Sequence, residues 1–341
     1  MARHSFPAIR HAALAVVLAT ILAPAVVAPA AAAPPPTVSS TTAECAEEAM
    51  STAGVSADGQ GEDPNDVSRE RVESVEALLA GAAQQAILRL LSRLGDLDHL
   101  RVTVPVHVHV ITRDDGSGAP SQDRLDAQLE VLNSAFAGQA SAASSATVFR
   151  FAVHSIDYTA NSDWYDWFLF GDTDDAEAKT ALHRGGPGEL DLYITGLQDA
   201  LGYATFPFDN AGPLDGVVIS AETLPGGGQD LYNLGDRLVH EVGHWLGLFH
   251  TFENGCESPG DGVPDTPYQH DGDNIVSCSE FEDTCPAPGL DPVHNFMSYG
   301  DDHCIDRFTP GQSVRMLLAW FAFRGASSHL GPLLPMGTLG W

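Results

Sequence analysis

The sequence predicts an α+β fold, with strands and helices in an upper half and a loop-rich, disulfide-bonded lower half that ends in a helix. Strand and helix patterns alternate from residue 101 to residue 245. Between Thr251 and Asp306 few residues can form a core, and four cysteines gather there instead. A helical apolar pattern then begins at Thr309. Regular structure on one side of the chain and cross-linked loops on the other define the fold class.

The upper half begins with an alternating pattern. Valines alternate with polar residues over residues 102–110, which is the period of a β-strand. His107 and His109 are therefore expected to be strand residues and not metal ligands. Ser121 can cap a helix that runs to Phe136 with its apolar residues on one face. Further strands are expected at 149–153, 190–194, 203–206 and 217–219, and shorter helices at 174–183 and from Leu231 onward.

The first hundred residues differ from the rest. Residues 1–33 combine an early positive charge, an apolar run and small-residue cleavage options, and they read as a secretory signal peptide. Residues 34–100 are read as a pro-segment or N-terminal extension, with a helical stretch over 68–94. Whether that helix is removed or remains part of the fold stays open. Residues 101–341 would form one domain, and we expect the mature protein to be secreted, without stable membrane insertion.

Charge and cysteine content narrow the class of protein. With 16 basic and 46 acidic residues the formal net charge is −30, which argues against nucleic acid or anionic lipid as a partner. A solvated acidic surface accounts for most of it. Four clustered cysteines in an exported protein suggest two disulfides, for which the sequence alone allows three pairings. The oligomeric state is left open.

Residues 240–250 carry the strongest motif. They fit the pattern H-E-x-x-H-x-x-G-x-x-H, in which neutral imidazoles can hold a catalytic zinc and a carboxylate lies near its water. His240 and His244 lie about 40° apart on one helix face. His250 can join them only if the helix stops, and Gly247 permits that stop. An amphipathic helix with chance histidines is the alternative, and it becomes less tenable with each added element of the motif.

A second motif lies about fifty residues further on. Residues 295–299 contain a methionine in a short turn. Met297 would form an apolar floor under the three histidines, and Tyr299 would reach the edge of the site. By itself a methionine in a loop is usually core, so this motif depends on the first.

Together these residues resemble the pappalysin family of metzincin metalloproteases, and especially its secreted microbial members. The resemblance covers roughly residues 100–316. It rests on residues 234–236, the long histidine motif with Thr251 and Phe252, residues 260–267, the methionine turn, and residues 308–312. It implies a metzincin-like catalytic domain with a twisted mixed sheet.

The resemblance also implies details that the residues alone do not establish. Cysteines would pair as Cys256 with Cys285 and Cys278 with Cys304. Residues 201–206 would be the edge strand above the cleft and would pair with an extended substrate. Some members of the family bind calcium after the motif, and Asp261 with Asp265 could serve here, although acidic loop residues are often only solvated.

The sequence therefore predicts a secreted zinc endopeptidase. Zinc on the three histidines would lower the pKa of a bound water, Glu241 would act as the general base, and the Tyr299 hydroxyl would stabilise the oxyanion. A zinc-containing binding or adhesion protein on the same fold is the alternative from another class. A zinc-dependent esterase or amidase is a third reading.

Two further expectations concern regulation and specificity. Cys45 lies outside the cysteine cluster and could occupy the open position of the zinc in a latent precursor, or it could be a free or intermolecularly paired thiol. Asp301 and Asp302 follow the methionine turn and could form a pocket for an Arg side chain just after the scissile bond. The alternative is that both carboxylates face solvent or a calcium ion.

Overall fold

The computed structural model describes residues 65–91, 101–166, 171–197, 200–209 and 211–325. The signal-peptide prediction for residues 1–33 and the latency prediction for Cys45 lie outside the described residues.

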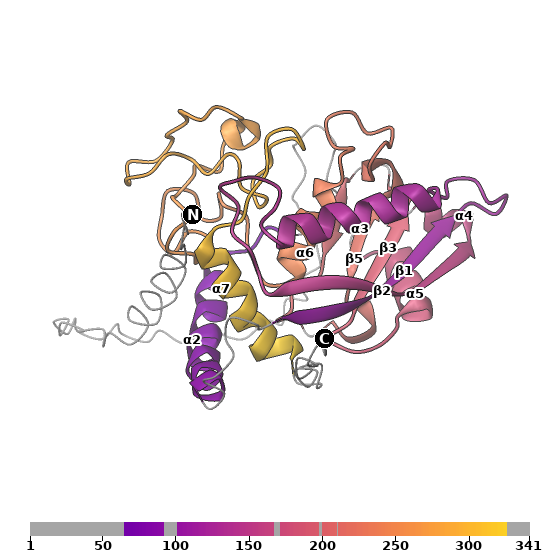
Figure 1. Ribbon diagram of the computed structural model, residues 1–341, viewed down its shortest axis with the longest axis horizontal. Coiled ribbons are helices and arrows are strands. Elements are labelled where there is room, and N and C mark those ends of the chain that lie inside the picture. Colours follow the sequence, from indigo (N-terminus) through magenta and orange to yellow (C-terminus); the bar gives the residue numbers. More distant parts are fainter. Residues whose placement is uncertain (1–64, 92–100, 167–170, 198–199, 210, 326–341) are drawn as a thin grey trace, which may run out of the picture. The chain divides into compact units, whose positions relative to one another are not determined.

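The core of the fold is a five-stranded mixed sheet in the order β2-β1-β3-β5-β4 (Figure 1). Four strands are parallel: β1 (Val102–Thr112), β2 (Phe149–Ala160), β3 (Leu190–Thr195) and β5 (Val217–Ser220). The short β4 (Gly202–Ala204) pairs antiparallel with β5 and forms one edge. The mixed sheet with its helices agrees with the predicted fold class.

Helices cover both faces of this sheet. On one face α3 (Gln122–Phe136) packs Leu132 and Phe136 against β1 and β2, and its first turn is capped by the Ser121 side chain, as predicted. On the other face lie α4 (Ser162–Tyr165) and α5 (Thr173–Leu182). Because β1 lies between β2 and β3 and both its faces are covered, His109 on this strand is fully buried despite its polarity.

The helix that carries the histidine motif is α6 (Asp236–Trp245). The expected start at Leu231 is wrong: Leu231 has φ 71° and Gly235 has φ 100°, and these left-handed conformations cannot belong to a right-handed helix. The helix stops before Gly247, whose φ of 95° reverses the chain as the sequence predicted. Its register therefore presents His240 and His244 together while His250 returns from the loop.

The chain after α6 contains little regular structure until α7 (Pro310–Ala319) and the adjoining π-helix η5 (Trp320–Arg324). Thr309 and Gln312 form a reciprocal capping box at the start of α7. Disulfides join Cys256 to Cys285 and Cys278 to Cys304, which is the pairing that the family resemblance implied. Three short 3₁₀ helices complete the described elements: η2 (Gly212–Leu214), η3 (Ala221–Thr223) and η4 (Asp273–Val276).

The N-terminal extension contains α2 (Arg69–Leu91), close to the helix predicted for 68–94. It lies beside α7 in Figure 1 and contacts both α7 and η5. Val72, Val75 and Leu79 are buried in a cluster with Phe206 and Phe249. In the described part of the chain, no helix combines the length and apolar character that crossing a membrane requires.

Candidate active site

Three histidines converge beneath the sheet edge. Nε2 of His244 lies 3.0 Å from Nε2 of His240 and 3.1 Å from Nε2 of His250. All three side chains are buried, with at most 1% of their surface exposed. The sharp turn at Gly247 brings His250 back to the two helical histidines, so the structure gathers all three predicted ligands at one point.

The other ring nitrogen of each histidine faces an acceptor. Nδ1 of His240 donates to the carbonyl of Phe296 at 2.7 Å, and Nδ1 of His244 donates to the carbonyl of Leu248 at 2.9 Å. Nδ1 of His250 lies 3.2 Å from a carboxylate oxygen of Asp66. With the protons held on Nδ1, the three Nε2 lone pairs point at one another, an arrangement that a cation would stabilise.

The burial of the histidines also supports their assignment as candidate metal ligands. It lowers the pKa of His240 and His244 well below the usual range, and the neighbouring histidines lower both further. Neutral imidazoles are the form that binds a metal ion. A donor set of three histidine nitrogens fits a catalytic zinc, which keeps one position open.

Glu241 lies beside this group and under the edge strand. Its side chain is 3% exposed, and one carboxylate oxygen lies 3.5 Å from Nη1 of Arg237. A Cβ atom on Gly202 in β4 would lie 3.1 Å from Cγ of Glu241 and 2.9 Å from the carbonyl of Val218. Gly202 thus allows the edge strand to approach the carboxylate closely. Arg237 is four residues before Glu241, and helical spacing alone could have identified it.

Met297 and Tyr299 close the site from below and from the side. Met297 is fully buried, and a Cβ on Gly243 would lie 2.4 Å from its sulfur, so the glycine of the motif makes room for the methionine. The Tyr299 ring packs 4.9 Å from the ring of His250 and 4.7 Å from that of Phe252. Met297 thus packs against Gly243 of α6 and Tyr299 beside His250, and the apolar floor under the histidines stays a prediction.

The end of α6 is held by arginines from the C-terminal helical segment. Nε of Arg324 donates to the carbonyl of Trp245 at 2.7 Å, and Nε of Arg315 donates to the carbonyl of Gly247 at 2.8 Å. These are carbonyls without a partner inside the helix, at its negative end. The helices α7 and η5 thereby stabilise the turn that returns His250 to the site.

Asp302 lies at the opposite end of α6. Its Oδ2 accepts from the backbone N–H groups of Leu234 at 2.7 Å and Gly235 at 3.2 Å, and the residue is 6% exposed. Burial raises its pKa. Burial and then the charge of Asp302 raise the pKa of neighbouring Asp236 to about 8. Asp301 instead accepts from the backbone of His303 in its own turn, so the two predicted pocket residues have different surroundings.

The two aspartates considered for calcium also differ. Asp261 is buried and accepts from the N–H of Val263, and burial raises its pKa to about 7. Asp265 holds the start of α7, where its oxygens accept from the Thr309 hydroxyl and the Gly311 N–H. Within the described ranges these two carboxylates do not share a cluster of candidate metal ligands.

Two residues of the N-terminal extension, Asn65 and Asp66, lie at the site, and no sequence motif predicted them. The Asn65 side-chain amide donates to the carbonyl of Ala204 at 2.8 Å and accepts from its N–H at 3.1 Å. Ala204 belongs to the edge strand β4, so these peptide groups face the side that β5 does not occupy. Asp66 lies next to His250.

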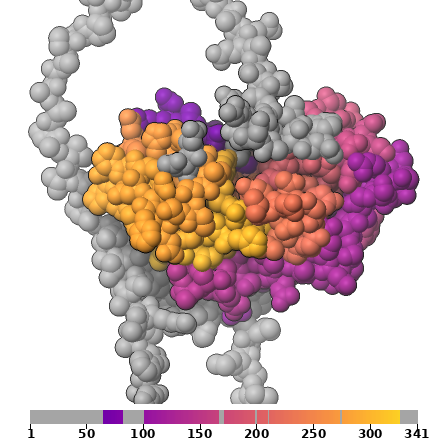
Figure 2. Space-filling view, turned by 90° about the horizontal axis from the view of Figure 1, so that it is seen from above, coloured from indigo at the N-terminus to yellow at the C-terminus, as the bar shows by residue number. Residues whose placement is uncertain are grey.

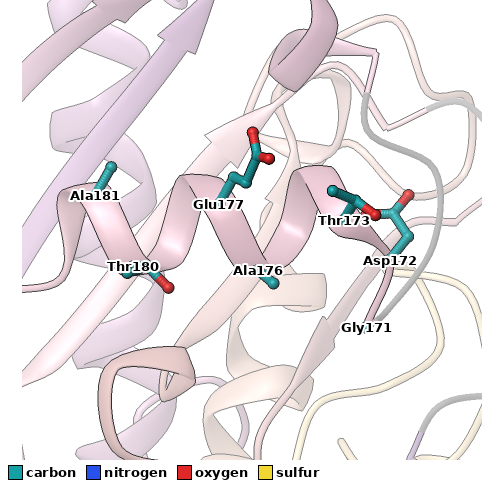
Figure 3. Close-up of a pocket in the computed structure, with 7 residues that line it drawn as sticks. All are labelled: Gly171, Asp172, Thr173, Ala176, Glu177, Thr180 and Ala181. Carbon is teal, nitrogen blue, oxygen red and sulfur yellow. The ribbon is translucent and has the colours of Figure 1, made fainter.

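One hollow of the surface lies away from the histidines. Its lining comes entirely from α5 and the turn before it (Figure 3): Gly171, Asp172, Thr173, Ala176, Glu177, Thr180 and Ala181. It contains no histidine or cysteine, and the three converging histidines lie on other elements.

Three buried histidines, a neighbouring carboxylate and a methionine turn on this mixed sheet define a metalloendopeptidase of the metzincin class. A family model described as pregnancy-associated plasma protein-A matches residues 190–319. An extracellular metalloprotease of Colletotrichum graminicola is 41% identical over 234 residues, which cover 66% of this chain and 79% of the relative. One of Arthroderma benhamiae is 36% identical over 240 residues, covering 68% of this chain and 76% of the relative.

Solved structures agree. Mature mirolysin of Tannerella forsythia in complex with a cleaved peptide is 27% identical, with a TM-score of 0.54 over 63% of this chain and 90% of that chain. A promirolysin mutant has the same fold, with a TM-score of 0.58 and 24% identity over 77% of this chain and 94% of that one. The chain belongs to the pappalysin family of metzincin metalloproteases.

Proposed function

We propose that the protein is a secreted zinc endopeptidase in which His240, His244 and His250 hold the metal and Glu241 is the general base. The observation that carries the proposal is the convergence of three Nε2 atoms, with the buried Glu241 directly after His240 in α6. Secretion is supported by relatives that are named extracellular metalloproteases. Peptide substrates are supported by the cleaved peptide in the mirolysin complex.

Zinc, when bound, supplies a Lewis acid that polarises the peptide carbonyl and makes water a better acid. Glu241 accepts the proton of the attacking water and returns it to the nitrogen of the leaving amine. Tyr299 offers its hydroxyl to the oxygen on which negative charge develops. Met297 keeps the floor of the site apolar, which excludes bulk water from beneath the histidines.

The edge strand binds the substrate backbone in this proposal. Ala204 has a peptide N–H and a carbonyl on the side of β4 away from β5, and an extended peptide would pair with both. Gly202 brings the same strand close to Glu241. A peptide in this register would thus be held beside the general base.

Glu241→Gln tests the mechanism. It keeps the size of the side chain but cannot accept the proton, so we expect hydrolysis of casein to fall by roughly 10²–10⁴-fold while folding and zinc content stay unchanged. The assay is run on mature protein, with and without a metal chelator. Wild-type turnover in the variant would remove Glu241 from its role.

The same assay separates the alternatives. A binding or adhesion protein on this fold would hold zinc but leave casein intact, and an esterase or amidase would cleave small esters or amides in preference to peptide bonds. Calcium binding at Asp261, with Asp265 beside the start of α7, is a further proposal. It predicts that a chelated sample recovers fully only when calcium is returned with zinc.

Specificity is proposed to come from the chain after the methionine turn. The carboxylate of Asp302 is buried near the start of α6, and a substrate guanidinium could pair with it. We expect cleavage before Arg, and less before Lys, with the Arg preference lost in Asp302→Ala and kept in Asp301→Ala. A digest of a peptide library measures both. Cleavage mainly before Leu or Phe would contradict this pocket.

Latency is proposed for the N-terminal extension. Asn65 occupies the peptide groups of Ala204 that a substrate would use, which supports a role for the extension as a pro-segment. Cys45 would add a thiolate ligand for the zinc. We expect full-length precursor carrying Cys45→Ala or Asn65→Ala to cleave peptides before processing. Equal latency in the variants and the wild type would argue for a permanent extension.

A further inference from the structure

Arg237 lies against the proposed general base. It is the second residue of α6, and its Nη1 is 3.5 Å from Oε1 of Glu241 one turn later. The contact is largely shielded from water, with 11% of the Arg237 side chain and 3% of the Glu241 side chain exposed. A guanidinium that faces a buried carboxylate attracts it and limits the positions that the carboxylate can take.

The stability of the helix does not explain Arg237. A cation in the first turn of a helix faces the positive end of the helix dipole. An ion pair with the cation four residues before the anion is the less favourable order on a helix surface. The neighbouring Asp236 already provides the acidic residue that a first turn favours. The position of Arg237 is better explained by the Glu241 carboxylate, which its guanidinium faces.

A second carboxylate lies near the same guanidinium. The positive charge of Arg237 acts on Asp302, which bonds to the backbone at Leu234 and Gly235. The guanidinium also lies 5.9 Å from the centre of the Tyr232 ring. Arg237 therefore acts on two carboxylates, those of Glu241 and Asp302.

We propose that Arg237 is a positioning residue that holds the Glu241 carboxylate in the orientation needed for proton transfer. The inference rests on the proposed role of Glu241. Glutamate has three rotatable side-chain bonds, and the edge strand at Gly202 offers no side chain to restrict them. A displacement of about 1 Å in a catalytic group can cost roughly 100-fold in rate.

The kinetic test compares Arg237→Met, which keeps length without charge, with Arg237→Lys. We expect Arg237→Met to lower kcat by roughly 10- to 100-fold with KM within about twofold, and Arg237→Lys to recover part of the loss. Guanidinium chloride at a low, non-denaturing concentration should partly restore Arg237→Met but not Glu241→Gln. Arg113→Met is the matched control, because Arg113 follows β1 and pairs with Asp166 just after α4 at a half-exposed site.

A second readout does not depend on turnover. The visible absorption of cobalt-loaded protein reports on the groups around the metal, and we expect Arg237→Met to change it while Arg113→Met does not. If the wild type proves inactive, the proposed function fails, and the cobalt spectrum still decides whether Arg237 orders Glu241. Wild-type kcat in Arg237→Met, an unchanged cobalt spectrum, or loss of zinc and thermal stability in parallel with kcat would overturn the inference.

Discussion

The sheet half, residues 102–220, and the loop half, residues 251–306, are stabilised by different means on the two sides of α6 (Figure 1). In the sheet half, β1, β3 and β5 bury nearly every side chain and pack against α3. The loop half has only a few buried apolar residues, but two disulfides span 29 and 26 residues of it. In Figure 2 the loop half, in orange, and the early strands and helices, in magenta, form separate parts of the surface.

The two halves also contribute different parts of the site. The sheet half supplies the edge strand β4 and packs against one side of α6. The loop half supplies Met297, Tyr299 and the backbone carbonyl of Phe296, which accepts from His240. A segment that must place a turn under three histidines cannot also be a regular strand. Cross-links substitute there for the burial that the segment lacks.

The buried polar residues of the sheet half are paired with residues of neighbouring strands. His109 has Nδ1 3.0 Å from a carboxylate oxygen of Asp157 and Nε2 2.9 Å from one of Asp191. Asp191 also accepts from Nδ1 of His183 at 2.7 Å. The prediction that His109 is a strand residue is confirmed, and its partners come from neighbouring strands because a buried polar group requires them.

Among the changes that test this difference between the halves, removing the disulfide between Cys256 and Cys285 is expected to have the largest effect on stability and zinc binding. Replacing both cysteines by serine should lower the free energy of unfolding by about 3–4 kcal/mol, because the unfolded chain regains the freedom of a loop. We also expect weaker zinc binding, since the loop half holds Met297 and Tyr299 against the histidines. Urea unfolding and a zinc competition titration measure the two quantities.

Leu192→Ala is the matched variant in the sheet half. Leu192 is fully buried in β3, so its truncation should cost a similar 2–5 kcal/mol, while zinc affinity of the folded protein stays the same. If the serine variant kept its zinc affinity and Leu192→Ala lost it, the assignment of site rigidity to the cross-linked loops would be wrong.

A smaller effect is expected where the two halves meet, at Asp236 beside Asp302. The pKa of Asp236 is raised to about 8 in the folded protein, by burial first and then by the charges of Asp302 and Asp306. Since the folded state binds this proton more tightly than the unfolded chain, stability falls as pH rises from about 4 to about 8. Asp236→Asn should remove this dependence and raise stability above pH 8 by about 1–3 kcal/mol.

Urea midpoints measured below and above this interval test the prediction, with Asp126→Asn on the exposed face of α3 as the control. Equal gains in both variants at high pH would mean that relief of the overall negative charge, and not the buried pair, is responsible. A larger effect for Asp236→Asn at low pH than at high pH would contradict the sign.

Several features were determined by the sequence alone, because each depends on local periodicity or on a short motif. The period of two in residues 102–110 specified β1, and Ser121 and Thr309 specified the starts of α3 and α7. The spacing of the histidines together with Gly247 specified a helix, a stop and a third histidine that returns to the first two. The cysteine pairing came from family resemblance and not from spacing.

Other features were decided only by the tertiary structure, because they join residues that are far apart in the chain. Asn65 pairs with Ala204 across 139 residues, and Asp302 bonds to Leu234 across 68. The start of α6 at Asp236 rather than Leu231 depends on backbone conformations that no side-chain pattern shows. The sequence states which groups are available to an active site, and long-range packing decides which of them face one another, since the cost of burying a polar group is met only by a partner that folding brings to it.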